Sequence, residues 1–167
     1  MLNKLLIIFV IILNYFFLFN AYSDDQVNFD VSQIEVLDGG NKIIGKKRGT
    51  ITTNDGVIIN ADEFEYDKIK NILKAKGNIT VNDESNDYII NSENILYLKD
   101  QEKIQIKGRS SSLIFLNYNF KSEDLIIYRD KLILESNKPT IIIDKKNQTL
   151  YEIDKFSYSI KDEVLKG

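Results

Sequence analysis

A short phrase that alternates apolar and polar residues returns five times in this chain at an almost constant interval. The copies read VSQIEV, ADEFEY, SENILY, SEDLII and IDKFSY, and they begin at positions 31, 61, 92, 122 and 153. A fixed period of about thirty residues is typical of stacked supersecondary units, each of which buries its apolar face against its neighbours. The pattern therefore predicts a repeat architecture.

The second copy shows the local structure that this pattern predicts. Val57, Ile59 and Ala61 hold one phase of a strand, and the apolar phase then slips by one residue before Phe64 and Tyr66. In a strand of period two, an odd step turns the side chains to the opposite face, so the sheet must bend or carry a bulge there. Because later copies repeat the slip, we expect the corners to align into one fold line.

A polar reversal of hairpin length follows each corner, and a strand follows the reversal. In two units this strand carries a glycine, Gly77 and then Gly108, as expected for a bend or a close backbone approach. The expected fold is all-β, an antiparallel roll of hairpin repeats in which two sheets meet along an edge. A parallel β-helix is the alternative, but its rungs are shorter and lack paired reversals. We expect strands near 57–61, 64–67, 72–81, 88–92, 95–98, 103–108, 118–122, 125–128 and 131–135.

Composition supports strands and narrows the chemistry. Pro occurs once in 167 residues, and His and Cys do not occur. The chain therefore has no disulfide and no His- or Cys-based catalysis or zinc site. With a formal net charge of −3 and scattered lysines, it lacks the basic stripe of a nucleic-acid protein. The one basic cluster, 46–48, is interpreted as a solvated turn, with an anion contact as the alternative.

Neighbouring carboxylates such as Asp62 and Glu63 recur at the predicted corners. A glycosidase needs two carboxylates across one cleft, whereas a pair repeated at equivalent positions indicates a structural role. We therefore expect no catalytic residue, no metal site and no cofactor.

The first residues follow the secretory pattern. Lys4 precedes an apolar run over 5–19, and Ala21-Tyr22-Ser23 resembles a cleavage site. A spanning helix needs about 20 apolar residues, and this run is shorter. We expect residues 1–23 to be a helical signal peptide that is removed on export, and 24–167 to be the mature domain. A retained membrane anchor is the alternative.

Residues 49–66, followed by 73–81, resemble the OstA-like N-terminal domain family of lipopolysaccharide transport proteins. The shared element is A-D-x-F-x-Y followed by L-x-A-x-G-N, and the resemblance covers 28–167. It implies a V-shaped β-jellyroll whose apolar interior holds lipid A acyl chains, and domains that join edge to edge into a bridge across the periplasm. Such a protein would be exported to the periplasm and associated with the outer membrane.

Within the family, segment 34–49 and the signal peptide are most similar to the periplasmic start of the lipopolysaccharide-assembly protein LptD. LptD continues into an outer-membrane barrel that this chain lacks, and the sequence stops at Gly167 in mid-repeat. We therefore expect a C-terminally truncated domain. A secreted structural or adhesive β-repeat protein and a membrane-tethered scaffold like LptC are the alternative functions.

The resemblance also implies site residues. Burial of an acyl chain is worth about 0.8 kcal/mol per CH₂ group, so a dozen carbons in water would cost on the order of 10 kcal/mol. The partners implied are lipopolysaccharide and an LptA-like bridge protein that adds a strand at the N-terminal edge, formed by Val27, Phe29, Val31, Ile34 and Val36. Recurrent tyrosines could place their hydroxyls at a wet rim, or pack as plain core. The expected lipid contacts are Ile59, Ala61, Phe64, Tyr66, Ile90, Ile95, Tyr97, Phe120, Leu125, Ile127, Phe156 and Tyr158.

Overall fold

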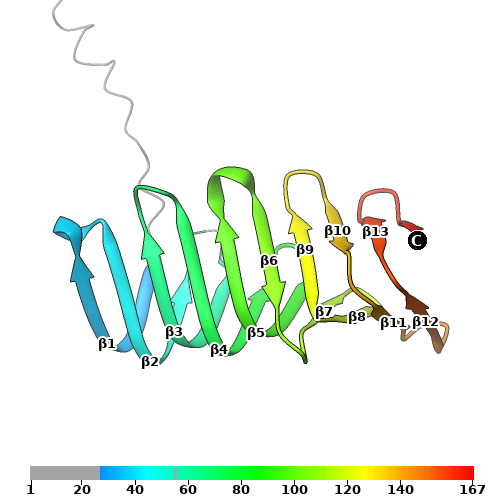
Figure 1. Cartoon of the computed structure of the whole chain (residues 1–167), viewed down its shortest axis with the longest axis horizontal. Coiled ribbons are helices and arrows are strands. Elements are labelled where there is room, and N and C mark those ends of the chain that lie inside the picture. Colours follow the sequence, from blue (N-terminus) through cyan, green and yellow to red (C-terminus); the bar gives the residue numbers. More distant parts are fainter. Residues whose placement is uncertain (1–26, 55) are drawn as a thin grey trace, which may run out of the picture.

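A computed structural model describes residues 27–54 and 56–167, and these form one antiparallel sheet of fourteen strands that is folded along its middle (Figure 1). The described part of the chain contains no α-helix; two short 3₁₀ turns, η1 (Asp38–Gly40) and η2 (Lys99–Gln101), interrupt the strands. The all-β, antiparallel prediction is confirmed. The expected signal peptide, residues 1–23, lies outside the described residues.

The first five strands are long and the later ones are short. The long strands are β1 (Asn28–Leu37), β2 (Lys42–Thr52), β3 (Ile58–Asp67), β4 (Ile72–Asp83) and β5 (Tyr88–Leu98). The short strands are β6 (Lys103–Lys107), β7 (Ser112–Phe115), β8 (Tyr118–Ser122), β9 (Asp124–Tyr128), β10 (Ile133–Ser136), β11 (Thr140–Asp144), β12 (Thr149–Ile153), β13 (Phe156–Ser159) and β14 (Val164–Lys166).

The long strands bend along one line: in β3 and β5 at the predicted corners, in β1 at the equivalent position of its phrase, in β4 beside Gly77, and in β2, where no corner was predicted. The pairing register shifts between 31 and 33 in β1, between 46 and 49 in β2, between 60 and 63 in β3, and between 76 and 79 in β4. These irregularities lie side by side and form the predicted fold line, which we call the crease. The segments 57–61 and 64–67, expected as two strands, are therefore the two halves of β3, and 88–92 and 95–98 are the two halves of β5.

Beyond β5 the two halves of the sheet separate into two arms. The second half of β5 pairs with β6, and its first half pairs with β7. We call these arms A and B. Arm A holds the second halves of β1, β3 and β5 and the first halves of β2 and β4. It continues with the short strands β6, β9, β10, β13 and β14. Arm B holds the other halves and β7, β8, β11 and β12. The chain alternates between the arms, so each later hairpin repeat is bent across the crease like the earlier ones.

Small residues allow the backbone to turn at the crease. Gly77 has φ +75°, a conformation that L side chains rarely adopt, and a Cβ atom there would lie 2.6 Å from Oδ2 of Asp62. Buried serines lie on the inner side: the hydroxyls of Ser92 and Ser111 are 3.0 Å apart, and Ser92 also donates to the carbonyl of Lys107. The glycine bend predicted from the sequence is confirmed at this position.

The basic cluster 46–48 lies inside strand β2 and not in a turn, which corrects the sequence interpretation. Lys47 has φ +66° and forms the bulge where β2 crosses the crease. All three side chains are exposed; Lys46 pairs with Glu35 at 2.8 Å, and Arg48 pairs with Asp62 at 3.2 Å. The cluster is therefore a solvated part of the bend.

The core lies between the two arms. One phase of every strand from β3 to β11 faces inward, and these apolar side chains are almost completely buried. The arm A turns at 68–71, 99–102, 129–132 and 160–163 lie along the side opposite the crease, which we call the mouth. Adjacent turns are joined by backbone hydrogen bonds, for example from Arg129 N–H to the carbonyl of Glu102 at 2.8 Å. Neighbouring repeats thus stack in register, as predicted.

Candidate ligand-binding groove

Two cavities lie between the arms along the mouth. The first has a volume of about 420 Å³, within the range of small-molecule sites. Its floor is apolar, and turn residues from both arms form its polar rim. The lining residues are Thr53, Asn54, Val57, Ile59, Leu73, Ala75, Val81, Tyr88, Ile90, Ile95, Tyr97, Lys99, Glu102, Ile104 and Arg129.

The second cavity is smaller, about 250 Å³, and lies further along the roll. Leu113, Phe115, Ile127 and Leu134 form its apolar wall, and the turn 85–87, Arg129 and Leu132 reach its rim. Tyr88 and Arg129 border both cavities. These two side chains therefore lie at the boundary between the two cavities.

Only some of the lipid-contact residues expected from the sequence line these cavities. Ile59, Ile90, Ile95 and Tyr97 line the first cavity, and Ile127 lines the second. The other expected residues face inward too, but they border neither cavity and pack in the core: Ala61, Phe64, Tyr66, Phe120, Leu125, Phe156 and Tyr158. The strand phase identified the inner face, whereas the spaces within it depend on how the two arms meet.

Sequence reasoning missed several cavity residues that carry a usable signal. Val57, Leu73 and Val81 occupy the same inward phase as the expected residues in β3 and β4. Tyr88, the first residue of β5, has the same inward phase as Ile90 and was also missed. Arg129 lies in the turn after β9, where the alternating pattern gives no assignment. The Arg129 side of the border between the cavities could therefore not be found from periodicity.

Tyr97 places its hydroxyl at the rim, as the sequence suggested for the recurring tyrosines. This hydroxyl accepts a hydrogen bond from Nη1 of Arg129 at 2.8 Å and lies 3.1 Å from both carboxylate oxygens of Glu102. Burial raises the pKa of Tyr97 to about 12, so the hydroxyl stays protonated near neutral pH. Burial, reinforced by the charge of Asp83, also raises the pKa of Tyr88.

Tyr158 does not follow the rim expectation. Its hydroxyl is buried and has no hydrogen-bond partner among the described residues. Its ring belongs to a cluster in which Phe120 lies 5.5 Å from Phe156 and 5.6 Å from Tyr158, with Tyr118 at 6.0 Å from Tyr158. These rings fill the interior between β8 and β13.

The edge strand β1 exposes apolar side chains of the inner phase. It pairs with β2 on one side, and its other edge is unpaired within the described residues. Ile34 and Val36 are 47% and 57% exposed, whereas Val27, Phe29 and Val31 are half-buried against the core. The five residues expected at a partner edge therefore do lie on or beside the edge strand.

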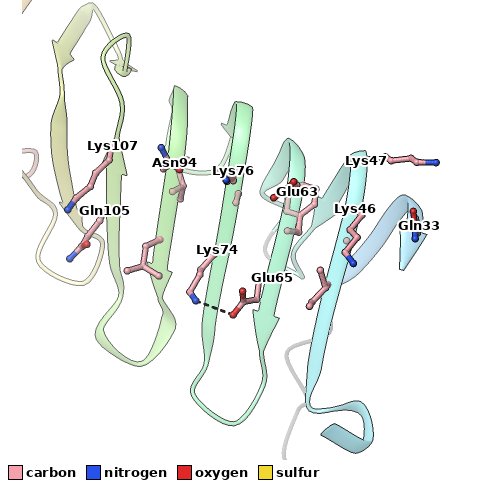
Figure 2. A pocket seen from close by; sticks show the side chains of 16 residues that line it. Gln33, Lys46, Lys47, Glu63, Glu65, Lys74, Lys76, Asn94, Gln105 and Lys107 are labelled. Atoms are coloured by element: carbon pink, nitrogen blue, oxygen red, sulfur yellow. Dashed lines mark hydrogen bonds and ion pairs between the residues drawn. The ribbon is translucent and has the colours of Figure 1, made fainter. Parts of the chain in front are cut away.

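A third hollow, of about 730 Å³, lies on the outer face of arm A (Figure 2). Figure 2 shows the glutamates of β3 between the lysines of β2 and β4. Lys74 is bonded to Glu65 at 3.0 Å. Lys42 also pairs with Glu65, at 3.3 Å, and the hydrogen bond from Lys74 lowers the pKa of Glu65. Exposed pairs of this kind contribute at most about 1 kcal/mol each. We interpret this hollow as a charged outer surface and the two inner cavities as the candidate site.

The described residues show neither a metal site nor a spanning helix. No group of three or more carboxylates among them is placed to hold a metal ion. In residues 27–54 and 56–167, no helix has the length and hydropathy needed to cross a membrane.

Comparison with known proteins identifies the fold. No protein-family model matches the chain, and no curated protein matches it. Among solved structures, the chain is similar to LptH from Pseudomonas aeruginosa, described as the LptA-homologous periplasmic component of a lipopolysaccharide transport device. The TM-score is 0.55 at 12% identity, over 77% of this chain and 84% of LptH. The fold is an LptA-like β-jellyroll. This likeness agrees with the fold that the OstA-like resemblance implied.

Proposed function

We propose that this chain is a periplasmic module of lipopolysaccharide transport, a member of the OstA-like family that shields lipid A acyl chains between its two arms. The observation that carries the proposal is the pair of apolar cavities along the mouth, in a fold similar to that of LptH. A carrier in an aqueous compartment must cover acyl chains, since each exposed CH₂ group costs about 0.8 kcal/mol.

The first cavity has an apolar interior and a charged rim. Ile59, Ile90 and Ile95 offer side chains without polar atoms to an acyl chain in the first cavity. Lys99 and Arg129 lie at the rim of the same cavity, where an anionic head group would remain in water. An amphiphile would therefore lie with its chains between the arms and its head group at the mouth. Nothing in this arrangement performs covalent chemistry, so the proposed role is binding and transfer without catalysis.

The exposed edge of β1 supports assembly into a longer carrier. Unpaired N–H and C=O groups of an edge strand can pair with a strand of another chain. Ile34 and Val36 would then continue the apolar inner face into the neighbouring domain, which we propose is an LptA-like bridge protein. Such a junction would join this domain to the outer-membrane end of the bridge, the position of the periplasmic part of LptD.

Site-specific photo-crosslinking tests the lipid site. Ile95 and Leu96 are adjacent in β5 and both border the outer hollow of Figure 2, but only Ile95, whose side chain is buried, also borders the first cavity. We expect a photoreactive residue at Ile95 to capture lipopolysaccharide in cells, and the same residue at Leu96 not to capture it. Equal capture at both positions would contradict an inner groove.

The packing between β8 and β13 favours a second candidate, a secreted structural or adhesive β-repeat protein. There Phe120, Phe156 and Tyr158 form a buried aromatic cluster, and none of the three borders either cavity. A structural protein would bury its interior permanently. No crosslink from Ile95, from a chain that is folded and exported, would favour this second function.

A further inference from the structure

The boundary between the two cavities spans the mouth. Asp83 ends β4 in arm B, and Arg129 begins the turn after β9 in arm A. Nη2 of Arg129 lies 3.9 Å from Oδ2 of Asp83. An ion pair therefore connects the two arms at the position where the two cavities meet.

Each partner is held firmly within its own arm. Asp83 is 1% exposed, and Asn86 donates to it twice, from its backbone N–H at 3.0 Å and from its side chain at 2.8 Å. Arg129 donates to the hydroxyl of Tyr97 at 2.8 Å, lies 3.4 Å from Glu102, and sits over the Tyr97 ring at 5.7 Å. The contact between the arms is longer than any of these hydrogen bonds. It can break while both side chains keep partners.

Breaking this contact would join the two cavities. Arg129 and Tyr88, the residue that pairs with Asp83 across the β4–β5 hairpin, border both spaces. The walls on either side are apolar, so an acyl chain meets a polar barrier only here. A chain that extends from the first cavity into the second must displace Arg129 from Asp83.

We propose that Arg129 and Asp83 form a gate across the mouth, which divides the groove into two compartments and opens when an acyl chain passes between them. This inference rests on the proposed function, since it assumes that acyl chains enter the groove. It adds a control point for movement along the groove. The gate is held by charge, and its opening therefore depends on the guanidinium and on the buried carboxylate.

The test uses a fatty acid that carries a photoreactive group at the chain end, incubated with the full chain and irradiated after increasing delays. Mass spectrometry then locates the crosslinks at the first cavity, near Ile59, or at the second, near Leu113. In Arg129→Gln the label should reach the second cavity about tenfold faster than in the wild type, the order of change expected for the loss of one partly buried ion pair. Arg129→Lys, which keeps the charge, should restore most of the delay.

Lys131→Gln is the matched control, because Lys131 lies in the same turn but over the ring of Tyr128 at 5.2 Å. It should behave as the wild type. The gate would be overturned if the label reached the second cavity at equal rates in the wild type and Arg129→Gln, or if Lys131→Gln accelerated it equally. Labelling of both cavities in that experiment would still support the groove. No labelling of either cavity in any variant would instead overturn the proposed function and the gate with it. If Arg129→Gln unfolds, Asp83→Asn tests the same contact, since asparagine can still accept the backbone hydrogen bond from Asn86.

Discussion

Substitution of Gly77 by alanine tests the crease that brings the two arms together. Gly77 has φ +75° and packs against the side chain of Asp62. Asp62 in turn accepts a hydrogen bond from the side chain of Asn78 at 2.6 Å and pairs with Arg48 at 3.2 Å. The new methyl group would lie 2.6 Å from Oδ2 of Asp62, so that carboxylate must move and the contacts it makes must change.

Two contributions set the expected loss of stability. A non-glycine residue in the left-handed region costs about 1 to 2 kcal/mol. Rotation of Asp62 away from the methyl group would remove one hydrogen bond and one exposed ion pair, which together contribute about 1 kcal/mol. We therefore expect Gly77→Ala to lower the free energy of unfolding by about 2 to 3 kcal/mol. With a typical urea m-value, the unfolding midpoint should fall by roughly 1 M.

Gly56→Ala separates the two contributions. Gly56 has φ +84°, but a Cβ atom there would have no neighbour within 4 Å, so this variant should show the backbone cost alone. Urea unfolding followed by circular dichroism measures both variants. Combining Gly77→Ala with Asp62→Ala should recover the part of the loss that comes from crowding. If Gly77→Ala costs no more than Gly56→Ala, the close packing of the crease against Asp62 is refuted.

Three further predictions concern a turn, a buried carboxylate and the edge strand. Glu163 is exposed and has φ +54°, so Glu163→Gly should raise the free energy of unfolding by about 0.5 kcal/mol, after the larger unfolded-state entropy of glycine is counted. A lower urea midpoint than that of the wild type would contradict this. Hydrogen bonds from Asn147 lower the pKa of Asp144, so the contribution of Asp144 to stability should be present at neutral pH and lost as the pH falls through that lowered value. The free energy of unfolding, measured with urea between pH 7 and 2, should therefore depend less on pH in Asp144→Asn than in the wild type. Identical pH profiles would count against this. Val36→Lys should weaken the binding of an LptA-like partner, measured by calorimetry, without changing the free energy of unfolding. The control Gln33→Lys, on the outer phase of β1, should bind the partner normally. Equal weakening by both would exclude a junction of inner faces.

The architecture was predictable because each repeat contacts mainly its neighbours. The one-residue slip between Ala61 and Phe64 predicted a corner, and the structure has a register shift at that position. Since every unit carries the same slip, the corners had to align. The period therefore predicted the crease, the stacking in register and the inward phase.

Several strands were missed for local reasons. Residues 42–52 contain two glycines and three consecutive basic residues, which favour a turn, yet they form β2 with a bulge at Lys47. The segment after Gly108 is rich in serine, but Ser111 is buried at the crease and β7 follows at once. In both cases pairing with neighbouring strands outweighs the local preference of the sequence.

The cavities could not be predicted, because strand phase shows which side chains face inward but not whether they fill the space between the arms. Opposite β8 and β13, four aromatic rings meet and leave no void. At β4 the inward residues Leu73, Ala75 and Val81 all border the first cavity, although their side chains differ in size. Volume depends on which residues of arm A face which residues of arm B, and that pairing is fixed by the angle at the crease. The same reasoning applies to Arg129 and Asp83: each resembles an ordinary turn residue in sequence, and only the approach of the two arms makes them partners.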